Sequence, residues 1–169
     1  NQFGSPLGEA ISLGMHESQS RWWETRIGQS KGFWKYYLPL LKQQFKGKFD
    51  KVPLEDFYNA VNKVTPSLIR VEADEVTYSL HVILRFELEC ELINGTLKVD
   101  AIPEAWNGKM KELLGMTPPT DADGCLQDIH WSCGDIGYFP TYTLGNLYAA
   151  QWMETARAEL GDLDLDLKA

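Results

Sequence analysis

Apolar side chains recur along most of the chain at the three- and four-residue spacing of an α-helix. This spacing predicts a first helix from Leu7 to about Ile27, with Pro6 near its first turn, where a missing N–H costs little. A second apolar run over residues 33–45 predicts another helix. Pro39 should bend that helix, and Gly47 should end it.

Helix signals continue through the rest of the chain. A third helix is expected to open at Pro53, and a further one to run from Pro103 to a glycine cap at Gly115. The Pro- and Asp-rich stretch 116–124 predicts a loop, and the last long helix should span about 141–161. The closing residues 161–167 read as a frayed tail or as the first turn of a further element. The fold class that this pattern predicts is mainly α.

Residues 80–102 fit two patterns. Apolar and polar side chains alternate through the first part and Asn94-Gly95 follows, which is typical of a short β-hairpin. The same leucines also repeat every four residues, as in a helix on whose surface Arg85 and Glu89 could pair. Length favours the helix, because about twenty residues pass without a breaker.

Composition narrows the class of protein. A chain of 169 residues suits a single helical domain over residues 1–169, which buries roughly 70% of its unfolded surface. The hydrophobic content of 44% argues against disorder. A net charge of -8 argues against nucleic acid as a partner, because phosphate contacts need a surplus of Lys and Arg. No apolar run reaches transmembrane length, so a membrane is not an expected partner either.

The three cysteines are Cys90, Cys125 and Cys133, an odd number without C-x-x-C spacing. A disulfide between Cys125 and Cys133 is an alternative, but free thiols fit the odd count better. Free thiols predict a reducing, cytoplasmic location.

The densest chemistry lies in the run from Gly124 to Trp131, which combines an amide, a carboxylate, an imidazole and an indole. His130 admits two interpretations. It is either a buried structural histidine held by Asp128, or an imidazole, oriented by Asp128, that hydrogen-bonds a substrate carbonyl or its oxyanion. Tyr142, shortly after, is either a packing residue or a second donor to that oxyanion.

Two earlier segments carry further candidates. Arg70 begins a stretch of charged and phenolic residues, which is either a solvated helix start or a site whose planar guanidinium captures a carboxylate. Glu17 lies four residues before Arg21 in the first predicted helix. It is either half of an exposed ion pair or a carboxylate ligand that completes a metal site begun by two histidines elsewhere.

Together these segments resemble the carboxypeptidase Taq family of zinc metallocarboxypeptidases. His16-Glu17-Ser18-Gln19 resembles the family's third-ligand motif, and the other two segments resemble its I-R-x-x-A-D and G-x-x-Q-D-x-H-W motifs. The resemblance covers nearly the whole chain. Three further short segments resemble the family's sequence: Trp106-Asn107, Gly137-Tyr138-Phe139-Pro140 and Leu144-Gly145-Asn146.

The resemblance implies a helical, cleft-forming architecture of the neurolysin and angiotensin-converting-enzyme type. It implies a zinc- or cobalt-dependent exopeptidase that removes C-terminal residues from peptides, usually as a homodimer. Carried over by position, Glu17 is the third metal ligand and Arg70 grips the substrate's C-terminal carboxylate. His130 and Tyr142 line the scissile carbonyl, and the neighbouring pair Gln127-Asp128 supports them on the substrate-binding side.

One departure from the family limits these expectations. The only histidines are His16, His81 and His130, so the family's H-E-x-x-H helix, with two ligands and a general base, is absent. A single carboxylate cannot hold catalytic zinc tightly, because such sites use about three protein ligands. We therefore expect a C-terminal part of the catalytic domain, inactive and without tightly bound metal when isolated. The alternatives are a metal-free helical module that binds peptide C-termini, and one half of a split peptidase.

Overall fold

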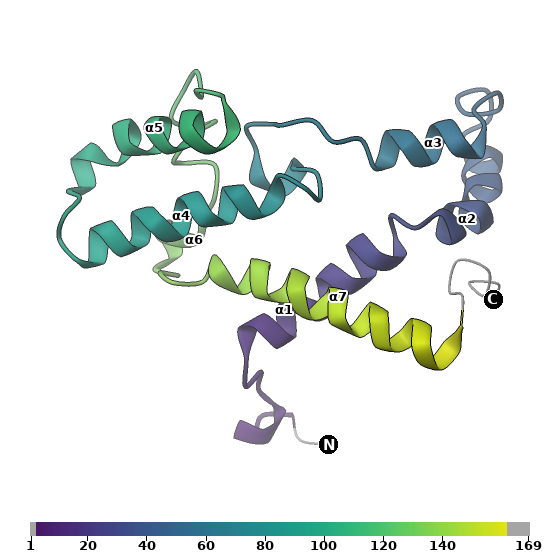
Figure 1. Cartoon of the computed structure of the whole chain (residues 1–169), viewed down its shortest axis with the longest axis horizontal. Coiled ribbons are helices and arrows are strands. Elements are labelled where there is room, and N and C mark those ends of the chain that lie inside the picture. The colour runs from purple at the N-terminus through teal and green to yellow at the C-terminus, as the bar shows by residue number, and fades with distance from the viewer. Residues whose placement is uncertain (1–2, 162–169) are drawn as a thin grey trace. The chain divides into compact units, whose positions relative to one another are not determined.

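The computed structural model describes residues 3–161, which fall into two compact units. The first unit comprises the residues up to Lys63 together with those from Leu144 on, and the second unit comprises Val64–Thr143. All regular structure within the described residues is helical, which confirms the mainly α class (Figure 1). That residues 1–169 fold as a single domain stays a prediction, and the closing residues 162–167 lie outside the described ones.

The first helix begins later than the sequence pattern predicts. Helix α1 spans Leu13–Arg21 and continues as a π-helical stretch, η2, over Trp22–Ile27, whereas the predicted start at Leu7 lies in the short 3-10 turn η1, Pro6–Gly8. The reason is local. The hydroxyl of Ser12 accepts the amide of Met15 at 3.2 Å, which caps α1 and sets its first turn.

Two further helices of the first unit follow the predicted punctuation. Helix α2 spans Lys31–Gln44, is capped by Ser30 and contains Pro39, and helix α3 spans Leu54–Val61 directly after Pro53. The chain between them passes through Gly47 at a φ of 83°. The two helices pack through aromatic rings, with Trp34 and Phe57 centroids 4.6 Å apart.

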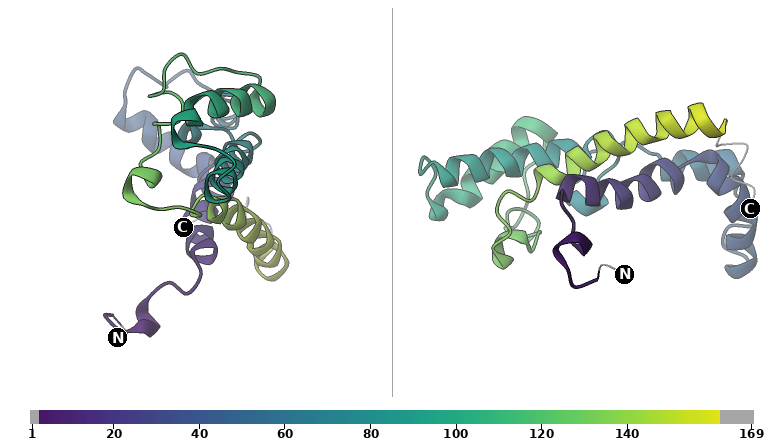
Figure 2. Two further views of the ribbon diagram at one scale, coloured as in Figure 1. Left: turned by 90° about the vertical axis from the view of Figure 1, so that its left-hand side faces the viewer. Right: turned by 90° about the horizontal axis from the view of Figure 1, so that it is seen from below.

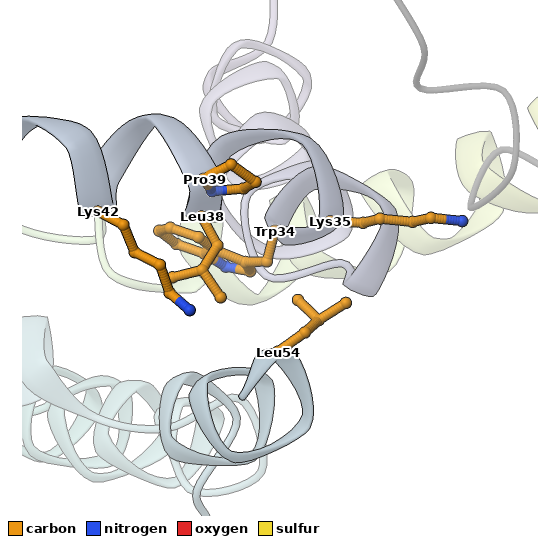
Figure 3. A pocket seen from close by; sticks show the side chains of 6 residues that line it. All are labelled: Trp34, Lys35, Leu38, Pro39, Lys42 and Leu54. Atoms are coloured by element: carbon orange, nitrogen blue, oxygen red, sulfur yellow. The ribbon is translucent and has the colours of Figure 1, made fainter. Parts of the chain in front are cut away.

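A pocket of about 210 Å³ opens between α2 and α3. In Figure 3 the Lys35 side chain extends away from the other five labelled ones. Lys42 donates from Nζ to the carbonyl of Val52 at 2.7 Å. The pocket is lined by Trp34, Lys35, Leu38, Pro39, Lys42 and Leu54. Its wall is mostly apolar and has no carboxylate or imidazole that could do acid–base chemistry.

The long helix α7, Pro140–Leu160, approaches α1 closely through glycines. A Cβ on Gly145 would lie 3.1 Å from the main chain and the Cγ of Glu17, and one on Gly14 would lie 3.2 Å from the Cβ of Leu144. Figures 1 and 2 show the two helices side by side along this stretch. The small residues therefore set the distance between the backbones at Glu17.

The second unit is built on two neighbouring helices, α4 over Tyr78–Ile93 and α5 over Ile102–Leu114 (Figure 1). Residues 80–102 are therefore helical for most of their length, as their length predicts, and the alternative hairpin is not formed. Pro103 lies in the first turn of α5 and Gly115 caps its end at a φ of 72°, both as predicted. The apolar core between the helices consists of Leu84, Leu88, Trp106, Met110, Leu114 and Cys125.

Shorter elements complete the second unit. The 3-10 turns η3, Arg70–Glu72, and η4, Val99–Ala101, precede α4 and α5, and α6 spans His130–Cys133. All three cysteines are free thiols. Within residues 3–161, no helix has the length and apolar character needed to cross a membrane.

Candidate functional site

Arg70 lies buried at the start of η3, with only 4% of its surface exposed. Its main-chain amide donates to Oε1 of Gln127 at 2.8 Å. Its guanidinium donates from Nη2 to Oδ1 of Asp128 at 2.7 Å and from Nη1 to the hydroxyl of Tyr78 at 2.7 Å. The structure thus joins two segments more than fifty residues apart, and the alternative of a solvated helix start is wrong for Arg70.

Asp128 binds a second arginine that the sequence pattern did not single out. The Nε of Arg85 donates to Oδ2 of Asp128 at 2.7 Å, whereas Arg70 makes its short bond to Oδ1 and only a 3.4 Å contact to Oδ2. Arg85 and Glu89 are both buried, so the predicted surface pair between them is wrong. Glu89 instead accepts the indole N–H of Trp131 at 2.8 Å.

Arg70, Arg85 and Asp128 shift one another's pKa values. Burial alone would raise the pKa of Asp128, but hydrogen bonds and charge from the two arginines hold it below its usual value. Burial lowers the pKa of Arg85 to about 10, against the opposing pull of Asp128. Burial also lowers the pKa of Arg70, but the hydrogen bond to Asp128 and nearby phenols raise it overall. At neutral pH all three groups are charged, and the cluster carries a net positive charge.

Gln127 connects this cluster to the surrounding loops. Its Oε1 accepts both the amide of Arg70 and Nη2 of Arg85, each at 2.8 Å. Its Nε2 donates to the carbonyls of Leu68 at 3.0 Å and Asp123 at 2.9 Å. Both donors and both acceptor positions of the amide are therefore used within the chain, which suits a supporting role rather than direct contact with a substrate.

His130 and Tyr142 form a pair beside the arginines. The Nε2 of His130 and the hydroxyl of Tyr142 are 2.9 Å apart. The Nδ1 of His130 lies 4.0 Å from Oδ1 of Asp128, which is too long for a hydrogen bond, so the predicted orientation of the imidazole by Asp128 is not a direct one. Burial lowers the pKa of His130, and Asp128 only partly opposes this, so the imidazole is neutral at neutral pH.

The aromatic rings of this region pack against Arg70. The guanidinium carbon lies 4.6 Å from the ring centre of Tyr142 and 5.6 Å from that of Phe139. Three of the five guanidinium N–H groups are used on Asp128 and Tyr78, which leaves two further donors on Nη1 and Nη2. A planar cation with two remaining donors is chemically suited to a carboxylate.

Glu17 belongs to the first unit. Its Oε1 accepts the hydroxyl of Ser20 at 3.0 Å, and its side chain is half-buried against Gly145. Arg21, the partner in the ion-pair interpretation, is buried and donates to Asn146 at 2.6 Å and Glu24 at 2.7 Å. Within residues 3–161, no three His, Cys, Asp or Glu side chains lie close enough to hold a metal ion, so these residues do not form a complete metal centre.

The family of the chain is evident from its similarity to known proteins. Residues 1–169 match the carboxypeptidase Taq (M32) metallopeptidases from end to end. The chain belongs to the carboxypeptidase Taq family. The resemblance inferred from the three motifs is thereby confirmed, and the family is one of peptide-bond hydrolases whose activity implies a divalent metal.

Relatives agree along nearly the whole chain. It is 56% identical over 162 residues to thermostable carboxypeptidase 1 of Thermus thermophilus, covering 96% of this chain and 32% of that protein. Carboxypeptidase 1 of Bacillus subtilis is 45% identical over 161 residues, with 95% and 32% covered. The M32 carboxypeptidase structure from Deinococcus radiodurans superposes with a TM-score of 0.89 at 46% identity, covering 98% of this chain and 33% of that one. The chain thus spans about a third of the length of these carboxypeptidases.

Proposed function

We propose that this chain is part of a metal-dependent carboxypeptidase that hydrolyses the C-terminal peptide bond of peptides. In this proposal the second unit supplies the wall that recognises the substrate's free C-terminal carboxylate. The observation that carries it is the buried Arg70 guanidinium, which Asp128 and Tyr78 hold in place while two of its N–H donors stay available. Membership in the carboxypeptidase Taq family supports it.

Recognition of the terminal carboxylate is what would distinguish an exopeptidase from an endopeptidase. A fixed, planar guanidinium binds a carboxylate in a defined orientation, and its bonds to Asp128 and Tyr78 reduce the freedom that it would lose on binding. A substrate without the charge would leave the net positive charge of Arg70, Arg85 and Asp128 without a counterion. Arg70 would therefore select chain ends.

His130 and Tyr142 would act one step along the substrate, at the scissile carbonyl. When Nε2–H of the neutral imidazole donates to the Tyr142 oxygen, the phenol O–H is the donor that a carbonyl oxygen would use as negative charge develops on it. The depressed pKa of His130 supports this role, because it keeps the imidazole neutral near physiological pH. Gln127 and Asp128 would hold the loop that carries His130.

The metal enters the proposal through Glu17. We assign Glu17 as the third ligand of a zinc or cobalt ion in the complete enzyme. That ion, when bound, would supply the activated water. The other ligands and the general base would come from outside residues 3–161, so the chain alone should bind metal weakly and no water-activating step is assigned to its own residues. A homodimer of the complete enzyme and a cytoplasmic location belong to the same proposal.

Calorimetric binding of two matched peptides tests the carboxylate wall. An acetylated tripeptide with a free C-terminus should bind the chain at least about tenfold more tightly than its C-terminal amide, because only the former pairs with Arg70. Arg70→Lys should remove most of this difference, since a lysine has no planar fork. Arg157→Lys, at an exposed position in the last turn of α7, is the matched control. Equal affinity of the unmodified chain for both peptides would contradict the proposal.

A further inference from the structure

The guanidinium of Arg85 is fully enclosed within the second unit. It is fully buried, with 0% of its surface exposed, and each of its three nitrogens has a partner. Nε donates to Asp128 at 2.7 Å, Nη2 to Gln127 at 2.8 Å, and Nη1 to the carbonyl of His81 at 2.7 Å. Its guanidinium carbon also lies 4.5 Å from the ring centre of Trp106. These contacts leave it no access to a substrate.

The contacts of Arg85 duplicate those of Arg70. Both arginines bind the same carboxylate: the short bond of Arg70 goes to Oδ1 of Asp128 and that of Arg85 to Oδ2. Both also bind the same amide oxygen of Gln127, one through its main chain and the other through its side chain. Arg85 is anchored to the rigid helix α4, whereas Arg70 lies in the short turn η3. Asp128 and Gln127 therefore link the Arg70 side chain and main chain to helix α4.

We propose that Arg85 is a positioning residue, which fixes Asp128 and Gln127 so that they hold the Arg70 guanidinium in its carboxylate-binding orientation. The inference rests on the proposed function of Arg70 and adds a residue to it. Without Arg85, Oδ2 of Asp128 loses its 2.7 Å partner and keeps only the long 3.4 Å contact to Nε of Arg70, so the carboxylate can rotate away from Nη2 of Arg70. Arg70 would then keep its charge and lose its fixed direction.

A purely structural role makes a different prediction. In that case Arg85 would stabilise the packing of α4 in general, and its loss would loosen all contacts of that helix alike. The indole N–H of Trp131 reports on this, because it donates to Glu89, one turn after Arg85 on α4. If Arg85 positions Arg70, its loss should change the solvent exchange of the Arg70 Nε–H, which donates to Asp128. The solvent exchange of the Trp131 indole N–H should stay the same.

The experiment is nuclear magnetic resonance of the arginine Nε–H and tryptophan indole signals in the whole 169-residue chain and its Arg85→Lys variant. Lysine keeps the positive charge but cannot bridge Asp128, Gln127 and the His81 carbonyl at once. We expect solvent exchange of the Arg70 Nε–H to quicken about tenfold and the preference for a free over an amidated C-terminus to fall about tenfold, with the Trp131 signal unchanged. Arg157→Lys should change none of these quantities.

Two results would overturn the inference. One is solvent exchange of the Arg70 Nε–H in Arg85→Lys identical to that in the unmodified chain. The other is an equal acceleration of solvent exchange at the Arg70 Nε–H and the Trp131 indole N–H. The readout also separates this inference from the function on which it rests. If the unmodified chain shows no preference for a free carboxylate, the proposed function fails, while the Arg70 signal still reports whether Arg85 positions it.

A measurement on the unmodified chain decides the question where Arg85→Lys does not fold. If Asp128 links the two arginines, their Nε–H groups should exchange with solvent through a shared opening, at rates within about threefold of each other. Both should exchange far more slowly than the exposed Arg157 Nε–H. Exchange of the Arg70 Nε–H much faster than that of Arg85 would show that the two are not coupled, and would overturn the inference.

Discussion

At the scale of single residues, His81 is a neutral imidazole enclosed beside two cations. It is fully buried on α4, and the charged groups that act on it are Arg85, Arg70 and Asp128. Burial is the largest cause of its pKa of about 4, compared with 6.5 for the free side chain, and the two arginines lower it further. The folded chain therefore resists protonation of His81.

This predicts a loss of stability in mild acid. Between pH 6.5 and about 4 the unfolded chain takes up a proton that folded His81 refuses, so the free energy of unfolding falls as the pH drops through that window. The contribution of His81 amounts to roughly 3 kcal/mol. Urea unfolding of the His81→Gln variant, measured from neutral pH down to pH about 4, should show a decline smaller by this amount.

Two controls isolate the effect. His16→Gln, at an exposed position on α1, should leave the pH dependence of the unmodified chain intact. Asp128, whose pKa is held down, contributes stability that is lost only as the pH falls below its ordinary value of 3.8, outside the window. Identical slopes for the unmodified chain and His81→Gln would show that His81 does not set the acid sensitivity.

How far the candidate site can be predicted from the sequence depends on what each residue's neighbours reveal. Arg70, Asp128 and His130 stand in short motifs, so their chemistry is visible locally. Arg85 stands in a leucine-rich helix four residues before Glu89, a spacing that is equally typical of an exposed ion pair. Only tertiary packing, which buries Arg85 against the loop after α5 and Glu89 against α6, distinguishes the two cases.

At the scale of elements, helix ends with local punctuation are predictable. Pro103 and Gly115 define both ends of α5, because each acts through its own backbone. The predicted start of the first helix at Leu7 is wrong because the apolar spacing extends further back than the helix does. The cap at Ser12 sets the first turn of α1. Periodicity reports which side chains are apolar, and capping decides where hydrogen bonding begins.

The approach of α7 to α1 predicts the effect of a single methyl group. In Gly145→Ala the new Cβ would meet the carbonyl carbon of Glu17 and the amide nitrogen of Ser18 at 3.1 Å, and main-chain atoms inside a helix cannot easily retreat. We expect the free energy of unfolding to fall by about 1–3 kcal/mol, measured by urea denaturation. The same change should alter the position of Glu17, whose Cγ is equally close.

Gly108→Ala is the matched control for this prediction. Gly108 lies in the interior of α5, and a Cβ there meets nothing within 4 Å. The substitution should raise the free energy of unfolding by about 1 kcal/mol, because alanine loses less backbone freedom in a helix than glycine does. Destabilisation by both substitutions would show that helix packing at Gly145 is not the cause.

At the scale of the whole molecule, residues 3–161 hold the side chains that we propose recognise a substrate carboxylate, but no complete metal centre. The second unit contains Arg70, His130 and Tyr142 in mutual contact or close to it. The first unit contains Glu17, and within residues 3–161 no three metal-binding side chains gather. Binding of a peptide terminus and cleavage of its last bond should therefore be separable properties.

The last prediction is that the purified chain does not release C-terminal residues from peptides, even with added zinc or cobalt. One carboxylate, the ligand that we propose at Glu17, cannot hold the metal tightly, and we assign the activation of water to no group within residues 3–161. Release of free amino acid is the measurement, with carboxypeptidase 1 of Bacillus subtilis as the active comparison. Chelator-sensitive release by the chain alone would contradict the prediction. Two other outcomes would favour the alternatives. If neither zinc nor a chelator changes the binding of free carboxylates, the chain acts as a recognition module by itself. Activity that appears only on mixing with a second chain would identify a split enzyme.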